Sequence, residues 1–120
     1  MTVQRPKELE ISVKTTAGFI VVAIIGDSIS ATNGSILDAK LKALLTPQAR
    51  FLLDMSAVRF VDSSGIGVIV SFMRAIQAKG GTLKLCGLTS SVRGLFKLIH
   101  LDQVFELSES SEQAISSSVQ

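Results

Sequence analysis

A carboxylate followed by two hydroxyls is the part of this sequence best suited to chemistry. Asp62, Ser63 and Ser64 follow a short apolar run and precede a segment with apolar residues at helical spacing, which predicts a strand-to-helix turn. Oxygen atoms at such a turn accept hydrogen bonds from the unpaired N–H groups of the first helical turn, and the same groups favour a phosphate. The residues alone leave two readings open, a plain helix cap and a site of phosphorylation.

Serine hydrolysis is a distant alternative. Asp62, Ser63 and His100, the single histidine, supply the side-chain types of a catalytic triad. However, Val61 stands where the G-x-S-x-G elbow requires glycine, and His100 lies in an apolar-rich run typical of a helix end or a core edge. We therefore do not expect an enzyme.

The remaining composition argues against other kinds of site and partner. Gly65 and Gly67 do not complete a dinucleotide fingerprint, and Cys86 with one histidine offers too few ligands for a metal, so no cofactor or metal is expected. A formal charge of +2 with scattered basic residues disfavours nucleic acid. The longest apolar run, 19–25, is too short to span a membrane. Cys86 reads as a reduced core residue, and the expected location is the cytoplasm.

Two glycines in the predicted helix need an explanation, because glycine inside a helix costs roughly 1 kcal/mol relative to alanine. Gly65 and Gly67 could fit closely under a neighbouring strand, or they could leave room beside Ser63 for a partner protein. The helix carries one apolar stripe at core spacing and a second stripe that includes Val68 and Phe72. The second stripe favours a partner, although a helix packed on two sides would explain it equally well.

The elements expected around this turn form one α/β domain. Period-two and apolar runs predict strands at 9–13, 19–25, 51–54, 82–86 and 104–107. Helices are expected after a cap at Thr32 or Asn33, over 64–79, after Ser90 or Ser91, and after Ser110, which forms a capping box with Gln113. We expect a mixed sheet of four to five strands flanked by helices. The domain should cover 9–115, with a lead at 1–8 and a flexible serine-rich tail at 116–120.

Two stretches resemble one known family. Phe51–Gly67, which reads FLLDMSAVRFVDSSGIG, resembles the signature of the STAS domains of sulfate transporters and anti-sigma factor antagonists. Leu98–Leu107 resembles the closing helix-to-strand segment of the same family. This sequence departs from the usual pattern of the family at one place. Gly26–Ser30 contains an extra residue and places Ser30 where members of the family often have aspartate. The acidic companion of the phosphorylation site is therefore missing.

The resemblance implies a STAS-type α/β sandwich without catalytic activity, acting as a stand-alone bacterial anti-sigma factor antagonist. Ser63 would be the phosphoacceptor and Ser64 the helix cap. The unphosphorylated protein would bind an anti-sigma factor that is also a serine kinase, and so free the sigma factor. Phosphorylation would break the complex, and a serine phosphatase would restore it.

A monomer or a weak dimer is expected. The implied docking face comprises Ser28, Ile29, Ser30, Thr32, Asn33, Ile66, Val68 and Phe72. The alternative is a STAS adaptor in another signalling or transporter-regulating partner switch.

Overall fold

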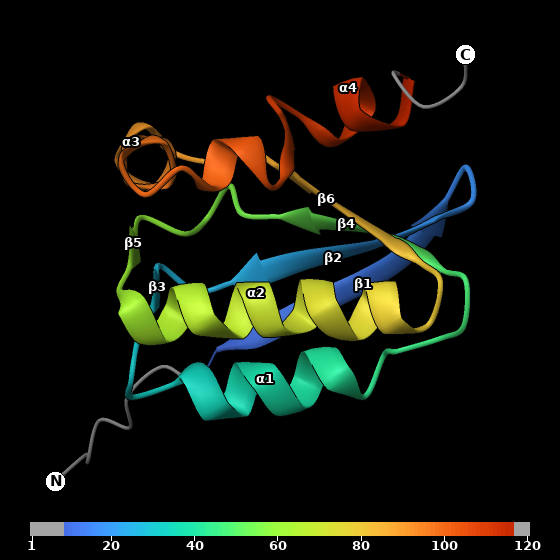
Figure 1. Ribbon diagram of the computed structural model, residues 1–120, viewed down its shortest axis with the longest axis horizontal. Helices are drawn as coiled ribbons and strands as arrows, with labels where there is room; N and C mark the ends of the chain where they lie inside the picture. The colour runs from blue at the N-terminus through green and yellow to red at the C-terminus, as the bar shows by residue number, and fades with distance from the viewer. Residues whose placement is uncertain (1–8, 117–120) are drawn as a thin grey trace, which may run out of the picture.

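A mixed sheet of five strands organises residues 9–116, which are the residues described by the computed structural model (Figure 1). The strands lie in the order β1 (Glu10–Thr16), β2 (Phe19–Ile25), β4 (Arg50–Asp54), β6 (Thr82–Cys86) and β7 (Glu106–Ser108). β1 is antiparallel to β2, and all other neighbours are parallel. The predicted mixed sheet flanked by helices is confirmed.

Helices cover both faces of this sheet. On one face, α1 (Gly34–Lys42) and α2 (Ser63–Ala78) run side by side, and α3 (Ser90–Leu98) extends the same apolar core at one end (Figure 1). The other face is covered by α4 (Ser111–Ser116), where Ala114 contacts a smaller cluster with Phe19 and Leu52. β2 contributes side chains to both clusters, so this continuously apolar strand is covered on both faces.

The hairpin between β1 and β2 turns at Ala17 and Gly18. Ala17 and Gly18 adopt positive φ angles of 51° and 81°, as a tight turn that matches the twist of the strands requires. The register then pairs Thr16 with Phe19 and Glu10 with Ile25. This hairpin lies at the edge of the sheet that is remote from α3 and β7.

A second sheet of two very short strands was not predicted. β3 (Ser28–Ile29) pairs in parallel with β5 (Phe60–Val61), whereas the sequence indicated a loop and an apolar connection for these residues. Two-residue strands are too short to show a period in the sequence, so only their pairing in space reveals them. The pairing brings the segment after β2 beside the start of α2 (Figure 1).

Several predicted boundaries and caps are corrected. α2 begins at Ser63, one residue earlier than expected, and the last strand is Glu106–Ser108 after a 3-10 turn, η1 (Leu101–Gln103). Thr89, not Ser90 or Ser91, caps α3 by accepting the N–H of Val92 at 3.5 Å. For α4, Ser110 accepts the N–H of Gln113 as predicted, but Gln113 Oε1 accepts the N–H of Glu109.

The described part of the chain lacks a helix with the length and apolar character needed to cross a membrane. The predicted lead at 1–8 and residues 117–120 of the predicted tail lie outside the described residues.

Candidate functional site

The start of α2 is capped by Asp62. Its backbone is extended, with φ of −96° and ψ of −173°, and its Oδ1 atom accepts the N–H of Gly65 at 3.0 Å. Asp62 is three residues before Gly65, which is the spacing of a typical N-cap hydrogen bond. The prediction that Ser64 caps the helix is therefore wrong. Because Asp62 takes this role, the exposed side chains of Ser63 and Ser64 on the first helical turn are not needed for capping.

The other carboxylate oxygen of Asp62 connects the helix to a second segment. Asp62 Oδ2 accepts the N–H of Ala31 at 3.3 Å, and the Asp62 N–H donates to the carbonyl of Ile29 at 3.1 Å. The loop after β3 is thus attached directly to the start of α2. This attachment brings together the two segments that the sequence analysis assigned to one docking face, although they are about thirty residues apart in the chain.

Hydrogen bonds within the loop fix its shape. Asn33 Oδ1 accepts the N–H of Ser30, and Asn33 Nδ2 donates to the carbonyl of Ser28, both at 2.9 Å. The hydroxyls of Ser30 and Thr32 lie 2.6 Å apart. Asn33 occupies the N-cap position of α1 as predicted, yet its side chain makes no capping bond because the loop uses it. At Ser30 the loop offers a neutral hydroxyl pair close to Asp62.

Gly65 and Gly67 differ in how much space surrounds them. A Cβ atom at Gly65 would lie 2.5 Å from the carbonyl oxygen of Ile29 and 2.7 Å from Cγ1 of Val61, so only glycine fits there. No atom lies within 4 Å of the corresponding position at Gly67, which is exposed. Close packing under a neighbouring strand therefore explains Gly65 and does not explain Gly67.

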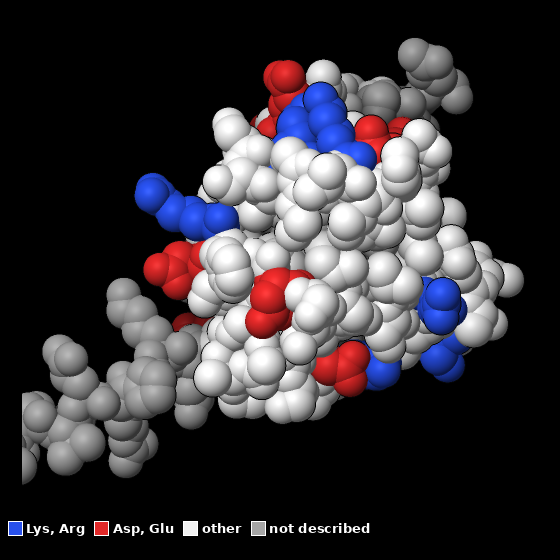
Figure 2. Space-filling view, turned by 60° about the vertical axis from the view of Figure 1, so that its left-hand side comes forward, with Lys and Arg blue, Asp and Glu red and all other residues white. Residues whose placement is uncertain are grey.

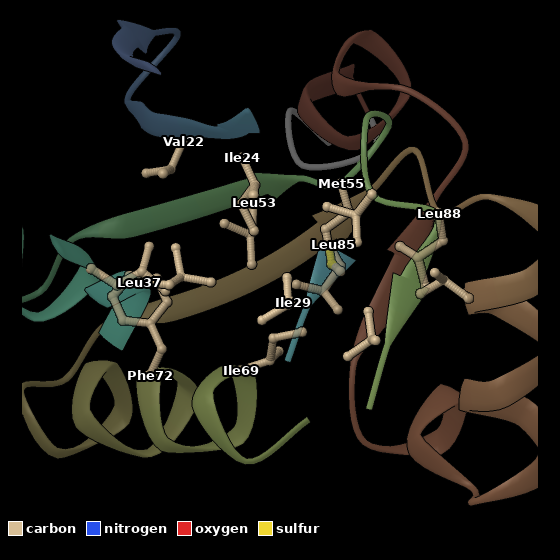
Figure 3. Packing of buried hydrophobic residues seen from close by; sticks show 14 of the residues in the cluster. Val22, Ile24, Ile29, Leu37, Leu53, Met55, Ile69, Phe72, Leu85 and Leu88 are labelled. Atoms are coloured by element: carbon tan, nitrogen blue, oxygen red, sulfur yellow. The ribbon is translucent and has the colours of Figure 1, made fainter. Parts of the chain in front are cut away.

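Two residues assigned to the docking face are buried. The side chains of Ile29 and Phe72 are 0% exposed, and both point into the apolar core in Figure 3. The ring of Phe72 lies edge-on to Phe51 with centroids 5.3 Å apart. These two assignments are corrected, because a buried side chain cannot contact a partner. Phe72 belongs to the core stripe of α2 together with Ile69 and Ile76.

The other predicted docking residues remain at the surface to different degrees. Thr32 is exposed, and the remainder are half-buried: Ser28, Ser30, Asn33, Ile66 and Val68. An exposed aromatic residue that the sequence analysis missed lies beside them, since Phe60 on β5 is 56% exposed two residues before Asp62. The sequence analysis placed Phe60 in an apolar connection, and its exposure follows from its position on the two-residue strand β5.

The surface around this end of the molecule carries few charges. Figure 2 brings forward the end where β3, β5 and the start of α2 lie, and it shows isolated acidic and basic groups on a mostly uncharged face. A largely neutral surface with a half-buried aliphatic rim and an exposed aromatic residue is suited to contact with a protein.

The residues considered for catalysis or for metal binding have other environments. Cys86 is buried, and burial, followed by the charges of Asp54 and Glu112, raises the pKa of its thiol from 9.0 to about 12. It is therefore a protonated core residue at neutral pH. His100 is exposed after the end of α3 with a φ of 63°. Asp62 accepts backbone N–H groups through both oxygens, whereas a catalytic aspartate would orient a histidine.

Metal ligation has no candidate in the described range, because no group of three or more His, Cys, Asp or Glu side chains between residues 9 and 116 is placed to hold an ion.

Comparison with known proteins identifies the family of this protein. The family model of the STAS domain matches residues 10–114, and the chain belongs to this family. It is similar to the anti-sigma-B factor antagonist of Bacillus subtilis, with 29% identity over 107 residues that cover 89% of this chain and 97% of the relative.

Solved structures share the fold. An anti-sigma factor antagonist from Mycobacterium paratuberculosis superimposes with a TM-score of 0.81 at 21% identity, covering 96% of this chain and 97% of that chain. The Bacillus cell fate determinant SpoIIAA in its phosphorylated form superimposes with a TM-score of 0.63 at 20% identity, covering 91% of this chain and 99% of that chain.

Proposed function

We propose that this protein is an anti-sigma factor antagonist that binds an anti-sigma factor while Ser63 is unmodified and releases it when Ser63 is phosphorylated. The observation that carries the proposal is the division of roles at the start of α2. Asp62 accepts the capping hydrogen bond, and this leaves the exposed hydroxyl of Ser63 available to a kinase. The similarity to anti-sigma factor antagonists supplies the kind of partner.

The fold can accommodate a phosphate at this position. Ser63 is the first residue of α2, where the positive end of the helix dipole and unpaired N–H groups favour an anion. A phosphoserine carries a charge of roughly −1.5 to −2 at neutral pH. The carboxylate of Asp62 is adjacent and opposes this charge, so the modified site would be strongly acidic while the rest of the domain stays folded.

The complex cannot accommodate the same charge. Ser63 and the half-buried aliphatic residue Ile66 lie three residues apart on one face of α2, so a partner that covers this surface would remove water from the phosphate. Burying such a charge without a matched partner costs several kcal/mol. A penalty of about 3 kcal/mol weakens binding roughly a hundredfold, which suffices to exchange partners.

The remaining parts of the scheme follow from the same site. The anti-sigma factor would be the serine kinase that modifies Ser63, with ATP bound on the kinase, and a serine phosphatase would remove the phosphate. The segment Ser28–Asn33 would contribute to the docking face, because the hydrogen bond from Ala31 holds it against Asp62.

Variants of the two adjacent serines test this proposal. We expect Ser63→Ala to bind the purified anti-sigma factor of the host like the wild type, and Ser63→Asp to bind about a hundredfold more weakly. Incubation with the anti-sigma kinase and ATP should add one phosphate to the intact mass of the wild type and of Ser64→Ala, and none to Ser63→Ala. A phosphate that is still added to Ser63→Ala would refute the site, and equal binding by both Ser63 variants would refute the switch.

A further inference from the structure

β1 is an edge strand with an open outer side. It is the first strand in the order of the sheet, and within residues 9–116 no strand pairs with the side that faces away from β2. Its residues pair with β2 in one continuous register, without a bulge, and its sequence contains no proline. Bulges and prolines are common means by which proteins block an exposed sheet edge. The edge at β1 is therefore able to accept another strand.

The hairpin decides which backbone groups of β1 point outward. Ala17 and Gly18 form a two-residue turn between the paired residues Thr16 and Phe19, and such a turn is closed by a backbone hydrogen bond between its two flanking residues. Along an antiparallel ladder, hydrogen-bonded pairs alternate with pairs that are not hydrogen-bonded. Every second residue of β1 therefore directs its N–H and C=O groups away from β2, and these residues are Ile11, Val13 and Thr15.

We propose that a second copy of this protein pairs with β1, so that two sheets join edge to edge around a twofold axis at Ser12. Antiparallel pairing around this axis places Ile11 of each copy opposite Val13 of the other, and these are residues whose backbone groups point outward. The two copies can thus exchange hydrogen bonds at both pairs, and the contact is closed because each copy uses the same strand. This inference does not rest on the proposed function.

The charges of β1 select this register. With the axis at Ser12, Glu10 of each copy lies opposite Lys14 of the other, in the pairs that are not hydrogen-bonded and whose side chains are closer. Both side chains are exposed, and neither has an ion-pair partner in the described part of the chain. An axis at Ile11 or at Val13 would instead place Glu10 opposite an uncharged hydroxyl side chain. The strand is therefore complementary in charge to a second copy of itself.

The opposite face of the joined strands would cover apolar surface. Ile11 and Val13 lie on the same face as the core residues Ile24 and Val22, with which they pair. Ile11 is nevertheless only half-buried, and Val13 is 45% exposed. Pairing these residues between two copies extends the apolar core across the edge. Two edge strands bury little area, so we expect a weak dimer with a dissociation constant on the order of 100 µM.

Disulfide crosslinking tests the position of the axis. Two copies of Ser12 would form a pair that is not hydrogen-bonded, with Cα atoms about 4.5 Å apart, which a disulfide can join. Under a mild oxidant, and above the dissociation constant, Ser12→Cys should form a covalent dimer. Val13→Cys should crosslink at least about tenfold more slowly, since diagonal neighbours are about 7 Å apart. Cys86 is buried, and the wild type controls for crosslinking through it.

Charge reversal tests the pairing without a covalent bond. Glu10→Lys and Lys14→Glu each place like charges opposite one another at both ends of the contact, so each should weaken self-association at least about tenfold. The double variant restores opposite charges and should associate like the wild type. A mixture of the two single variants should form a heterodimer, because each chain then meets the opposite charge. Lys40→Glu on α1 is the matched control, since Lys40 is exposed and its reversal changes the net charge as Lys14→Glu does.

Sedimentation equilibrium at low ionic strength, where charge pairs are least screened, measures these associations. A wild type that stays monomeric at about ten times the expected dissociation constant would overturn the proposal. Faster crosslinking of Val13→Cys than of Ser12→Cys would overturn the axis at Ser12. An equal loss of association in Lys40→Glu, or a double variant as weak as the single ones, would overturn the charge pairing. The proposed function is tested separately by the variants of Ser63.

Discussion

The carboxylate of Asp62 holds together two segments of the site, and its removal should weaken both. In Asp62→Ala the N–H of Gly65 loses its acceptor at 3.0 Å, and the N–H of Ala31 loses a longer one at 3.3 Å. Loss of an N-cap side chain costs about 1 kcal/mol. Loss of a negative charge at a helix N-terminus costs roughly 0.5 kcal/mol, and loss of the exposed second bond costs about 0.5 kcal/mol.

These contributions predict a decrease of about 2 kcal/mol in the free energy of unfolding, which corresponds to a fall of about 8 °C in the thermal midpoint. Urea denaturation followed by circular dichroism measures this change, and the slope against urea concentration should stay constant. Asp62→Asn keeps an acceptor oxygen without the charge, so its loss should be about half as large.

Asp27→Ala is a suitable control for this series. Asp27 is exposed and joins the structure through its backbone carbonyl, which accepts from the N–H groups of Arg59 and Phe60. Its side-chain carboxylate can therefore be removed with little effect on stability. If Asp62→Ala unfolds within about 0.5 kcal/mol of the wild type, or if Asp27→Ala loses as much as Asp62→Ala, the capping role assigned to Asp62 is wrong.

Two further predictions concern buried positions. Gly65→Ala should destabilise the domain by about 3 kcal/mol, because the added methyl group meets the Ile29 carbonyl, a backbone atom that cannot move away cheaply; a stability equal to that of the wild type in urea denaturation would contradict the close approach. Cys86 should react with a thiol reagent at pH 8 at least about a thousandfold more slowly in the folded protein than in 6 M guanidinium chloride, because burial raises the pKa of its thiol from 9.0 to about 12 and so lowers the thiolate fraction. Equal rates in the two states, followed by absorbance, would show that the thiol is exposed.

Much of the sheet could be predicted from local patterns. The alternation of Leu9, Ile11 and Val13 predicts a half-buried strand, and the continuous apolar run at 19–25 predicts a strand covered on both faces. β1 and β2 form at these places, although β1 begins after Leu9 and leaves Val13 45% exposed. Such patterns are informative because a strand of several residues repeats its environment along the chain. β3 and β5 have two residues each, and their pairing depends on the path of the chain in space.

The faces of α2 show why Phe72 was wrongly assigned to the surface. The sequence contains one apolar stripe at core spacing and a second stripe that includes Val68 and Phe72, and the second stripe favoured a partner. The packing of Phe72 against Phe51 decides the rotation of the helix about its axis and buries Phe72, while Val68 and Ile66 remain half-exposed. Helical periodicity identifies which residues share a face, but the partner of that face is decided by tertiary packing.

The motif from Asp62 to Gly67 depends partly on the local sequence and partly on the tertiary structure. By itself the sequence determined that an acid, two hydroxyls and two glycines meet at the start of a helix, because strand, turn and helix signals follow one another along the chain. Only the tertiary structure decided which side chain caps the helix, since the reach of Asp62 to Gly65 and to Ala31 depends on the loop after β3. It also separated the glycines, because a crossing strand excludes a side chain at Gly65 and leaves Gly67 open to solvent.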